Sequence, residues 1–375
     1  MRTKIKASAT VLDAGVQLLG TINTLQVFGM DIAKLVFQVH SVHPVSGKPQ
    51  SVQLKRADVV DYFNQYGTCF IALEACGSAH YWGRTLQENG HVIRLLPTTL
   101  IQPFISGNKS DAIDARAIWL AAQLPDVKFV SVKSVEQQAV LTLHRQRDTL
   151  KKFKTRQLLA LRGLLYEFGL IFPRGGRAIF LREVMGVLDD ETSILPEFLR
   201  GSLRDQVERI KALDASVDQI DTRLKACFDS NEDMQRVATI PGVGMLTATA
   251  IIATMGNPAT FNSGREFCAW LGLVPKQFGS GGKIRMLGIS KKGDAYIRTL
   301  LIHGARSVLF RTKNKNPWLD QLRERRPMNI AVVAQAAKTA RIIWAVTAKK
   351  VAYHVEQDQI RDSVDITEKE WTTET

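Results

Sequence analysis

The fold is decided first by residues 25–31, which have the sequence LQVFGMD. This apolar run ends on a carboxylate, and the β-branched, partly alternating run LVFQVHSV follows it at 35–42. Both patterns predict β-strands. A third, weaker strand is predicted at 51–54, and the buried-type run CFIAL at 69–73 predicts a strand that ends at Glu74. Three strands in succession therefore precede the first strand that is expected to be buried on both faces.

Helices are predicted between and after the later strands. Helical spacing covers residues 57–66, 79–89 and 111–124, and a fifth strand is predicted at 91–96. The resulting order, β-β-β-α-β-α-β-α, predicts an α/β domain over residues 25–130.

The remainder of the chain is predicted to be mainly helical. Leu203, Ile210, Val217 and Leu224 recur every seven residues. That spacing fits two helices of one chain packed together or a coiled coil between chains, and the sequence leaves both open. The predicted parts are an N-terminal extension at 1–24, the α/β domain at 25–130, a helical, coiled-coil-like region at 131–230, a helical C-terminal domain at 231–351 and an acidic tail at 352–375.

The composition excludes several classes of protein. The 375 residues are 45% apolar and 23% charged, which is typical of a globular protein of two or three domains. No run of 18 uncharged apolar residues occurs, so we expect no membrane partner. Four scattered cysteines without C-x-x-C predict neither a zinc site nor a disulfide framework, and fit a cytoplasmic location. A net charge of +14 predicts polyanionic partners.

Four carboxylates stand at the ends of predicted elements. Asp31 and Glu74 end two strands, and Asp111 and Asp114 lie three residues apart at the start of a helix, on one face. If the two strands are neighbours, all four acids converge, and cations must offset their repulsion. Oxygen ligands suit Mg²⁺ or Mn²⁺, and two such ions stabilise both oxygens of a phosphodiester displacement. Taken singly, each acid also fits a solvated or capping role, Asp111 in particular.

A glycine-containing turn is predicted in the C-terminal half. Residues 240–244, IPGVG, precede a helical run. Gly242 and Gly244 allow a tight turn that presents backbone N–H groups to a phosphate. The pattern predicts a helix-hairpin-helix that binds the DNA backbone, and a plain turn between two helices fits it equally well.

A second glycine-rich segment, KQFGSGGK at 276–283, contains Ser280. It is not a phosphate-binding loop of the NTPase type, because Gln277 and Ile284 occupy positions at which that motif requires other residues. Spacing alone favours a turn that contacts phosphate over catalysis by the serine. Residues 276–298 carry six bases against one acid, and these bases are the predicted nucleic-acid contacts: Lys276, Lys283, Arg285, Lys291, Lys292 and Arg298.

Motifs in both halves resemble those of the insertion sequence 110 transposases, most closely the insertion sequence 1111 branch. Residues 29–34 (GxDxxK), 73–77 (LEACG) and 108–115 (NKSDAxDA) resemble the DEDD set of the family. Residues 275–283 (PKQxxSGGK) and 289–298 (ISKKGDxYIR) resemble its C-terminal transposase domain. The likeness extends over most of the chain, with the two motif sets in the order that the family has.

The resemblance implies a fold, a site and partners. It implies an RNase H-like N-terminal domain similar to RuvC, in which Asp31, Glu74, Asp111 and Asp114 bind Mg²⁺ or Mn²⁺, and a C-terminal domain in which Ser280 is the nucleophile. Members of the family act on element ends and a target in double-stranded DNA, with a noncoding RNA that the element encodes. We expect a homo-oligomer, a dimer that becomes a larger assembly such as a tetramer on nucleic acid.

Three functions are compatible with the residues. A transposase or recombinase uses both the acids and the serine, whereas a metal-dependent, structure-specific nuclease of the Holliday-junction resolvase type uses only the acids. A non-catalytic nucleic-acid-binding protein requires only the positive charge. The family resemblance favours the first.

Overall fold

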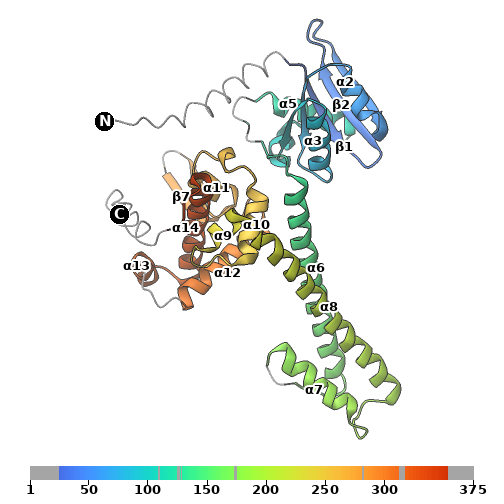
Figure 1. The fold of residues 1–375 in the computed structure, drawn as a ribbon, viewed down its shortest axis with the longest axis vertical. Helices are drawn as coiled ribbons and strands as arrows, with labels where there is room; N and C mark the ends of the chain where they lie inside the picture. Colours follow the sequence, from blue (N-terminus) through green and yellow to red (C-terminus); the bar gives the residue numbers. More distant parts are fainter. Residues whose placement is uncertain are drawn as a thin grey trace. The chain divides into compact units, whose positions relative to one another are not determined.

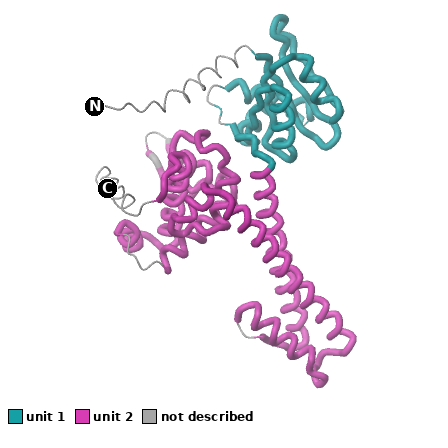
Figure 2. The backbone as a smooth tube through the Cα atoms, viewed as in Figure 1, with its two compact units in different colours: residues 1–135 teal, residues 136–375 magenta. Residues whose placement is uncertain are grey.

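The computed structural model describes residues 25–108, 110–124, 127, 129–172, 175–280, 283–311 and 317–353. The predicted N-terminal extension lies outside these residues, as does the predicted acidic tail beyond residue 353. The chain divides into two compact units, residues 1–135 and 136–375 (Figure 2). The second unit contains both the helical region and the C-terminal domain that the sequence predicts separately.

Unit 1 contains a mixed sheet with helices on its faces (Figure 1). The elements are β1 (Val27–Ile32), β2 (Val36–Val42), β3 (Pro49–Lys55), η1 (Arg56–Asp58), α2 (Val59–Asn64), β4 (Phe70–Glu74), α3 (Ala79–Glu88), β5 (Val92–Leu96), α4 (Thr98–Ile101), η2 (Gln102–Phe104) and α5 (Asp111–Ala122). The predicted order of strands and main helices is confirmed. Helix α4 and η2 form between β5 and α5, where the sequence predicted no helix or strand.

The five strands lie in the order β3-β2-β1-β4-β5. β1 and β2 pair in antiparallel fashion, as do β2 and β3, while β4 is parallel to both β1 and β5. The strand pair on which the predicted acid site depends, β1 and β4, is therefore adjacent, and the carboxyl ends of these two strands lie at the same edge of the sheet.

Both faces of this sheet are buried in apolar cores. On β4, Ile71 and Leu73 belong to one core together with side chains of α2 and α3, while Phe70 and Ala72 belong to the other together with side chains of α5. Alternate residues of a strand point to opposite faces, which produces this division. Burial on both faces explains why β4 has an almost continuous apolar sequence.

Unit 2 is mainly helical and contains one β-hairpin (Figure 1). The elements are α6 (Val135–Tyr166), α7 (Arg177–Asp189), α8 (Glu197–Asp229), α9 (Glu232–Ala238), α10 (Met245–Met255), η3 (Pro258–Thr260), α11 (Gly264–Trp270), β6 (Pro275–Ser280), β7 (Lys283–Ile289), α12 (Ala295–Arg311), α13 (Pro317–Arg325) and α14 (Met328–Lys349). The long helices α6 and α8 run antiparallel. Arg147 of α6 forms hydrogen bonds with Asp221 of α8, whereas Lys154, about two turns later in α6, bonds to Asp214, which lies earlier in α8.

The apolar side chains of the seven-residue repeat in α8 pack against other helices of the same chain. Leu203 and Ile210 pack in one core with Leu161 and Leu165 of α6, and the later part of the repeat packs in a second cluster through Leu224. The structure thus supports the first of the two arrangements that the spacing allowed, a pair of amphipathic helices within one chain. A coiled coil between chains is not needed to bury these side chains.

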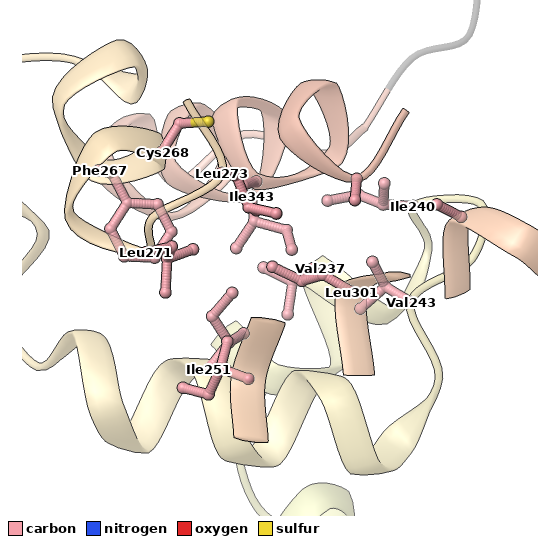
Figure 3. Packing of buried hydrophobic residues seen from close by; sticks show 14 of the residues in the cluster. Val237, Ile240, Val243, Ile251, Phe267, Cys268, Leu271, Leu273, Leu301 and Ile343 are labelled. Carbon is pink, nitrogen blue, oxygen red and sulfur yellow. The ribbon is translucent and has the colours of Figure 1, made fainter. Parts of the chain in front are cut away.

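The C-terminal helices surround a separate core (Figure 3). Val237, Ile251 and Leu301 come from three helices and meet Ile343 of α14 there. By length and composition α14 is apolar enough to cross a membrane, but 56% of its most apolar 18-residue window is buried in the protein. Helix α14 is therefore explained as the core helix of this domain.

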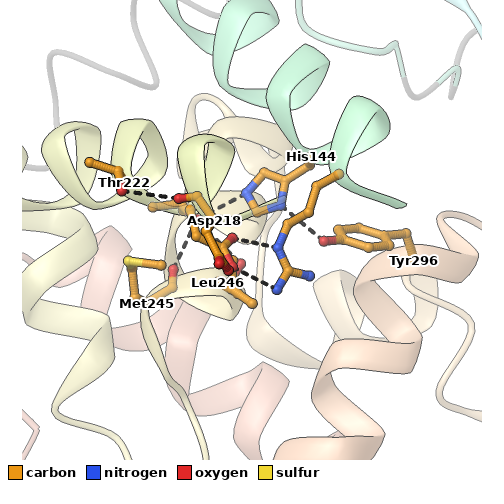
Figure 4. A network of polar contacts seen from close by, with 9 residues as sticks. His144, Asp218, Thr222, Met245, Leu246 and Tyr296 are labelled. Carbon is orange, nitrogen blue, oxygen red and sulfur yellow. Dashed lines mark hydrogen bonds and ion pairs between the residues drawn. The ribbon is translucent and has the colours of Figure 1, made fainter. Parts of the chain in front are cut away.

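A buried polar network joins α6 to the C-terminal helices (Figure 4). The imidazole of His144 is 3.0 Å from the hydroxyl of Tyr296 through Nδ1 and 2.9 Å from the hydroxyl of Thr249 through Nε2. Burial, helped by the positive charge of Arg147, lowers the pKa of His144 to about 4. His144 is therefore neutral at physiological pH, with both ring nitrogens paired to hydroxyl groups.

This network predicts a pH-dependent stability. The pKa of His144 is about 4 in the folded chain and near 6.5 in the unfolded chain. The unfolded chain therefore takes up a proton first, and the contribution of His144 to the unfolding free energy, complete above pH 6.5, is lost as the pH falls toward 4. We expect the wild type to lose about 3 kcal/mol more unfolding free energy than His144→Gln between about pH 7.5 and about pH 4, by urea unfolding. His303→Gln, at an exposed histidine of α12, serves as the control. Equal losses in wild type and His144→Gln would contradict the assignment.

Candidate active site: a carboxylate cluster and a basic serine hairpin

The close approach of α5 to β1 places the carboxylates. A Cβ atom added to Gly29 of β1 would lie 2.4 Å from the carbonyl oxygen of Ala115 and 2.5 Å from the backbone nitrogen of Trp119. No residue with a side chain fits at this contact. The indole Nε1 of Trp119 also donates a hydrogen bond of 3.1 Å to the carbonyl oxygen of Val27. Helix α5 is thereby held directly against the strand that carries Asp31.

Each of the four acids lies at the end of an element. Asp31 and Glu74 lie near the carboxyl ends of β1 and β4, which are parallel neighbours. Asp111 and Asp114 lie in the first turn of α5. Asp31 follows Gly29 by two residues, so it shares the face of β1 that α5 covers. Strand pairing and helix packing together bring the four positions to one edge of the sheet.

The charges of these acids interact. The pKa of Asp31 is raised from 3.8 to about 6, first by burial and then by the negative charges of Asp114 and Asp111. Glu74 acts in the same direction, and a backbone hydrogen bond at Ile32 opposes the shift. Among the described residues, no Lys, Arg or His forms an ion pair with any of the four. Within the part of the chain that the structure describes, no ion pair therefore offsets the repulsion in the cluster.

The donor chemistry of the cluster fits a divalent cation. Carboxylate oxygens are the ligands that Mg²⁺ and Mn²⁺ prefer. The Oδ1 atom of Asp114 is buried without a hydrogen-bond partner, and a cation would satisfy it. The hydroxyl of Thr98 donates to Oε1 of Glu74 at 2.6 Å and orients that carboxylate. Within the described ranges, no three His, Cys, Asp or Glu side chains are arranged to hold an ion as they stand, so binding requires some side-chain rotation.

The N-cap of α5 is Ser110, not Asp111. The Oγ of Ser110 accepts a hydrogen bond from the backbone N–H of Ile113 at 3.4 Å. The capping role that the sequence left open for Asp111 is therefore wrong. Asp111 is exposed in the first helical turn, where the helix dipole favours a negative charge, and its carboxylate remains accessible to a ligand.

Ser280 lies in a β-hairpin, in the glycine-rich segment for which the sequence predicts only a turn. β6 and β7 are antiparallel, with Phe278 opposite Arg285 and Ser280 opposite Lys283. The two turn residues, 281–282, lie outside the described residues. A sequence signal for this hairpin exists, because two consecutive glycines between two short runs are typical of a two-residue hairpin turn.

Close backbone contacts fix the base of this hairpin. Gly272 and Gly293 have φ angles of 74° and 71°. A Cβ atom on Gly272 would lie 2.2 Å from the carbonyl oxygen of Lys292. The N–H of Ser290 donates to the carbonyl oxygen of Val274 at 2.8 Å. The segment before β6 and the segment after β7 are thus held together, and the hairpin projects from this junction.

The predicted nucleic-acid contacts around the hairpin divide into two groups. The guanidinium of Arg298 is half-buried and donates to the carbonyl oxygens of Leu271, at 3.0 Å, and Lys292, at 2.7 Å. Arg298 therefore has a structural role in holding the hairpin base, which the sequence did not predict. The other predicted bases are exposed and accessible to a phosphate: Lys276, Lys283, Arg285, Lys291 and Lys292.

Comparison with known proteins gives one consistent result. The profile of the "Transposase IS116/IS110/IS902 family" matches residues 234–322. A "Probable family 20 transposase" of Pseudomonas aeruginosa is 44% identical over 329 residues, which are 87% of this chain and 97% of that protein. The "Transposase for insertion sequence element IS1111A" of Coxiella burnetii is 39% identical over 88% of this chain and 91% of its own length.

The chain belongs to the IS110 family of insertion-sequence transposases. A further relative, the "Transposase for insertion sequence element IS1328" of Yersinia enterocolitica, is 31% identical over 87% of this chain. The resemblance inferred from the motifs is therefore confirmed at the level of the family. The activity is that of a DNA transposase, and DNA is its substrate.

In this transposase the turn between α9 and α10 packs against α12. Gly242 has a φ of 83°, and a Cβ atom on Gly304 of α12 would lie 2.0 Å from the carbonyl oxygen of Gly242. Gly242 is therefore required by packing as well as by the turn. Gly244 is exposed, has open space around its Cβ position and directly precedes α10. Gly244 is the residue of the turn at which a DNA backbone has room to approach.

The glycine contact predicts a large effect of one methyl group. Gly304→Ala places a Cβ against the Gly242 carbonyl, and we expect it to lower the unfolding free energy by about 1–3 kcal/mol in chemical denaturation. The matched control is Gly186→Ala in α7, where no atom lies within 4 Å of the Cβ position. That change is expected to raise stability by about 0.5–1 kcal/mol. Similar effects of the two substitutions would disprove the close contact.

Proposed function

We propose that this transposase cuts and rejoins DNA with Ser280 as the nucleophile, assisted by a divalent metal ion at Asp31, Glu74, Asp111 and Asp114. The observation that carries the proposal is the convergence of these four acids from β1, β4 and α5, with mutual repulsion that no described Lys, Arg or His offsets. The mixed sheet with α5 packed on β1 supports the RNase H-like, RuvC-like fold that we assign to unit 1.

The acids supply a set of oxygen donors at one edge of the sheet, which side-chain rotation would complete around an ion. Mg²⁺, or Mn²⁺, would neutralise the carboxylates and polarise the phosphate that is attacked. Asp114 contributes the buried oxygen that has no hydrogen-bond partner, and Asp31 contributes a carboxylate that is costly to ionise without a cation. Thr98 holds Glu74 in position through its hydroxyl. Strand pairing and the packing of α5 on β1 hold the backbone positions of these residues in place during strand exchange.

The serine chemistry conserves the phosphodiester energy. The Ser280 hydroxyl oxygen bonds to the phosphorus, and the bond from that phosphorus to a deoxyribose oxygen breaks. The serine loses its proton and the departing deoxyribose oxygen gains one, so a free DNA hydroxyl and a DNA–serine phosphodiester result. Attack by a hydroxyl of another DNA end reverses these steps and joins the strands. Lys283 and Arg285, exposed on the opposite strand of the hairpin, supply positive charge to the phosphate.

The positive charge of the chain is assigned to nucleic acids. We assign double-stranded DNA, as element ends and target, to the hairpin bases and to the helix-hairpin-helix formed by α9 and α10. A noncoding RNA encoded by the element guides the choice of DNA, and a homo-oligomer, a dimer that becomes a tetramer on nucleic acid, carries out the exchange. The chain acts on DNA in the bacterial cytoplasm.

The metal assignment predicts loss of cleavage without loss of folding. Asp114→Asn removes one donor charge from a cluster that repels itself, so the metal-free protein should melt at the same temperature or higher. DNA cleavage in Mg²⁺ is expected to fall about 100-fold or more. Mg²⁺ should raise the melting temperature of the wild type and have little effect on the variant.

Asp61→Asn, at an exposed acid of α2 in the same unit, is the control and should keep wild-type cleavage and metal response. Wild-type cleavage by Asp114→Asn would remove this residue from the site. Full wild-type activity in the presence of a chelator would remove the metal.

The serine assignment predicts a covalent product. A substrate with a nick near the cleaved bond traps the intermediate, because the short cleaved fragment diffuses away and cannot rejoin. After digestion of the protein, mass spectrometry should find a peptide containing Ser280 joined to DNA through phosphate. Ser280→Ala should lose this product and cleavage, while Ser307→Ala, at an exposed serine of α12, should keep both.

The competing nuclease of the Holliday-junction resolvase type uses water as the nucleophile. It predicts normal cleavage by Ser280→Ala and no protein-linked DNA in the wild type. That pair of results would replace the serine mechanism with a metal-dependent nuclease, and the acid cluster would then be the whole catalytic site.

A further inference from the structure

The serine hairpin carries an exposed aromatic side chain to which the proposed chemistry gives no role. Phe278 in β6 is 70% exposed, and Met286 and Leu287 in β7 are 52% and 45% exposed. Phe278 and Met286 lie on opposite faces of the hairpin, and large apolar side chains left exposed in this way are candidates for contact with another molecule. Phe278 does not belong to the hydrophobic core of the domain, whereas Val274 and Ile289 at the base of the hairpin pack against that core.

The strand register places Phe278 among positive charges. Phe278 pairs with Arg285 across the hairpin, and Lys283, two residues from Arg285, lies on the same face of β7. Both basic side chains are exposed. A flat apolar ring flanked by cations matches a nucleotide, which offers an aromatic base beside a charged phosphate. An uncharged protein partner would leave these cations without a counterpart.

The position of Phe278 relative to Ser280 limits which base it meets. The two residues are two positions apart in β6, which corresponds to about 7 Å along a strand. Successive phosphates of one DNA strand are about 3.4 Å apart along the helix axis, so this separation spans about two base steps. An aromatic ring at this distance reaches a base within two nucleotides of a phosphate bound at Ser280.

The hairpin is prepared for such a contact by its fixed base. Gly272 packs against the carbonyl oxygen of Lys292, and the Ser290 N–H bonds to the Val274 carbonyl. These contacts hold both ends of the hairpin, so little ordering entropy remains to be lost at its base when DNA binds. The side chain of Phe278 has only two rotatable bonds, which also keeps the entropy cost of stacking low.

We infer that Phe278 is a positioning residue that stacks on a DNA base within two nucleotides of the cleaved phosphate. The stacked base holds the backbone in place beside the hairpin, as inserted apolar side chains do in proteins that open base steps. This inference rests on the proposed function, because it takes the phosphate at Ser280 to be the cleaved one. The occupant is DNA rather than RNA, since the cleaved strand is the one that must lie at this hairpin.

The test is photocrosslinking with the full-length chain. The probe is an element-end DNA duplex in which 5-iododeoxyuridine replaces single thymidines near the cleaved phosphate. Crosslinked peptides are identified by mass spectrometry in wild type, Phe278→Ala, Phe278→Trp and the matched control Phe310→Ala. Phe310 is 62% exposed in α12 of the same domain, so its removal changes a similar apolar area away from the hairpin.

We expect a crosslink between Phe278 and a base within two nucleotides of the cleaved phosphate. Phe278→Ala should lose it and bind the duplex about 5-fold to 150-fold more weakly, which corresponds to one lost aromatic–base stack. Phe278→Trp should restore both binding and crosslinking, and Phe310→Ala should behave as wild type. Rescue by tryptophan separates stacking from a merely structural role.

Crosslinking does not require cleavage, so the same assay in Ser280→Ala tests the base contact of Phe278 independently of the serine mechanism. A crosslink at Phe278 in a Ser280→Ala chain that still cleaves DNA would support the aromatic contact while the serine mechanism fails. Wild-type binding and cleavage by Phe278→Ala would overturn the inference. So would crosslinks of this hairpin to 5-iodouridine in RNA alone, or a change of oligomeric state in Phe278→Ala with DNA binding intact.

Discussion

The absence of a side chain at Gly29 is the constraint on which the acid site depends. With a Cβ atom at that position, α5 would be pushed away from β1 by contacts of 2.4 Å and 2.5 Å with its backbone. Asp114 lies on the turn of α5 that this contact fixes, and Asp31 lies two residues beyond Gly29 on the same face of β1. The electrostatic coupling between the two carboxylates follows from a backbone contact that neither of them makes.

Sequence patterns predicted the elements of unit 1 well because each pattern is local. The run ending at Asp31, the buried-type run ending at Glu74 and the helix start at Asp111 are visible in a few consecutive residues. That β1 and β4 are neighbours depends on sheet order, which spacing does not encode. The close contact of Gly29 could not be predicted from the sequence either, because its partners, Ala115 and Trp119, lie far along the chain.

In unit 2 the sequence left the structure open where long-range contacts decide it. The repeat at Leu203 and Leu224 allowed two arrangements, and only packing against α6 distinguishes them. Arg298 is an arginine in a basic segment and was predicted to contact phosphate. Its guanidinium donates hydrogen bonds to two backbone carbonyl oxygens, those of Leu271 and Lys292. The sequence predicts only a turn at the hairpin containing Phe278, because glycine and lysine depress strand propensity, and cross-strand pairing overrides that local preference.

The carboxylates of the cluster form no ion pair with a described lysine or arginine, although Lys34 and Arg116 stand two or three residues from them in the sequence. A lysine or arginine close to Asp31 or Asp114 would form ion pairs, lower the pKa of these carboxylates and occupy the oxygens that a divalent ion needs. The exposed bases of the hairpin would in turn lose part of their attraction for phosphate if acids lay beside them. The partly exposed, self-repelling carboxylate cluster belongs to unit 1, and the exposed basic hairpin belongs to unit 2. Within the described residues the carboxylates thus keep their oxygens free of ion pairs, and the hairpin bases keep their charge exposed for a polyanion.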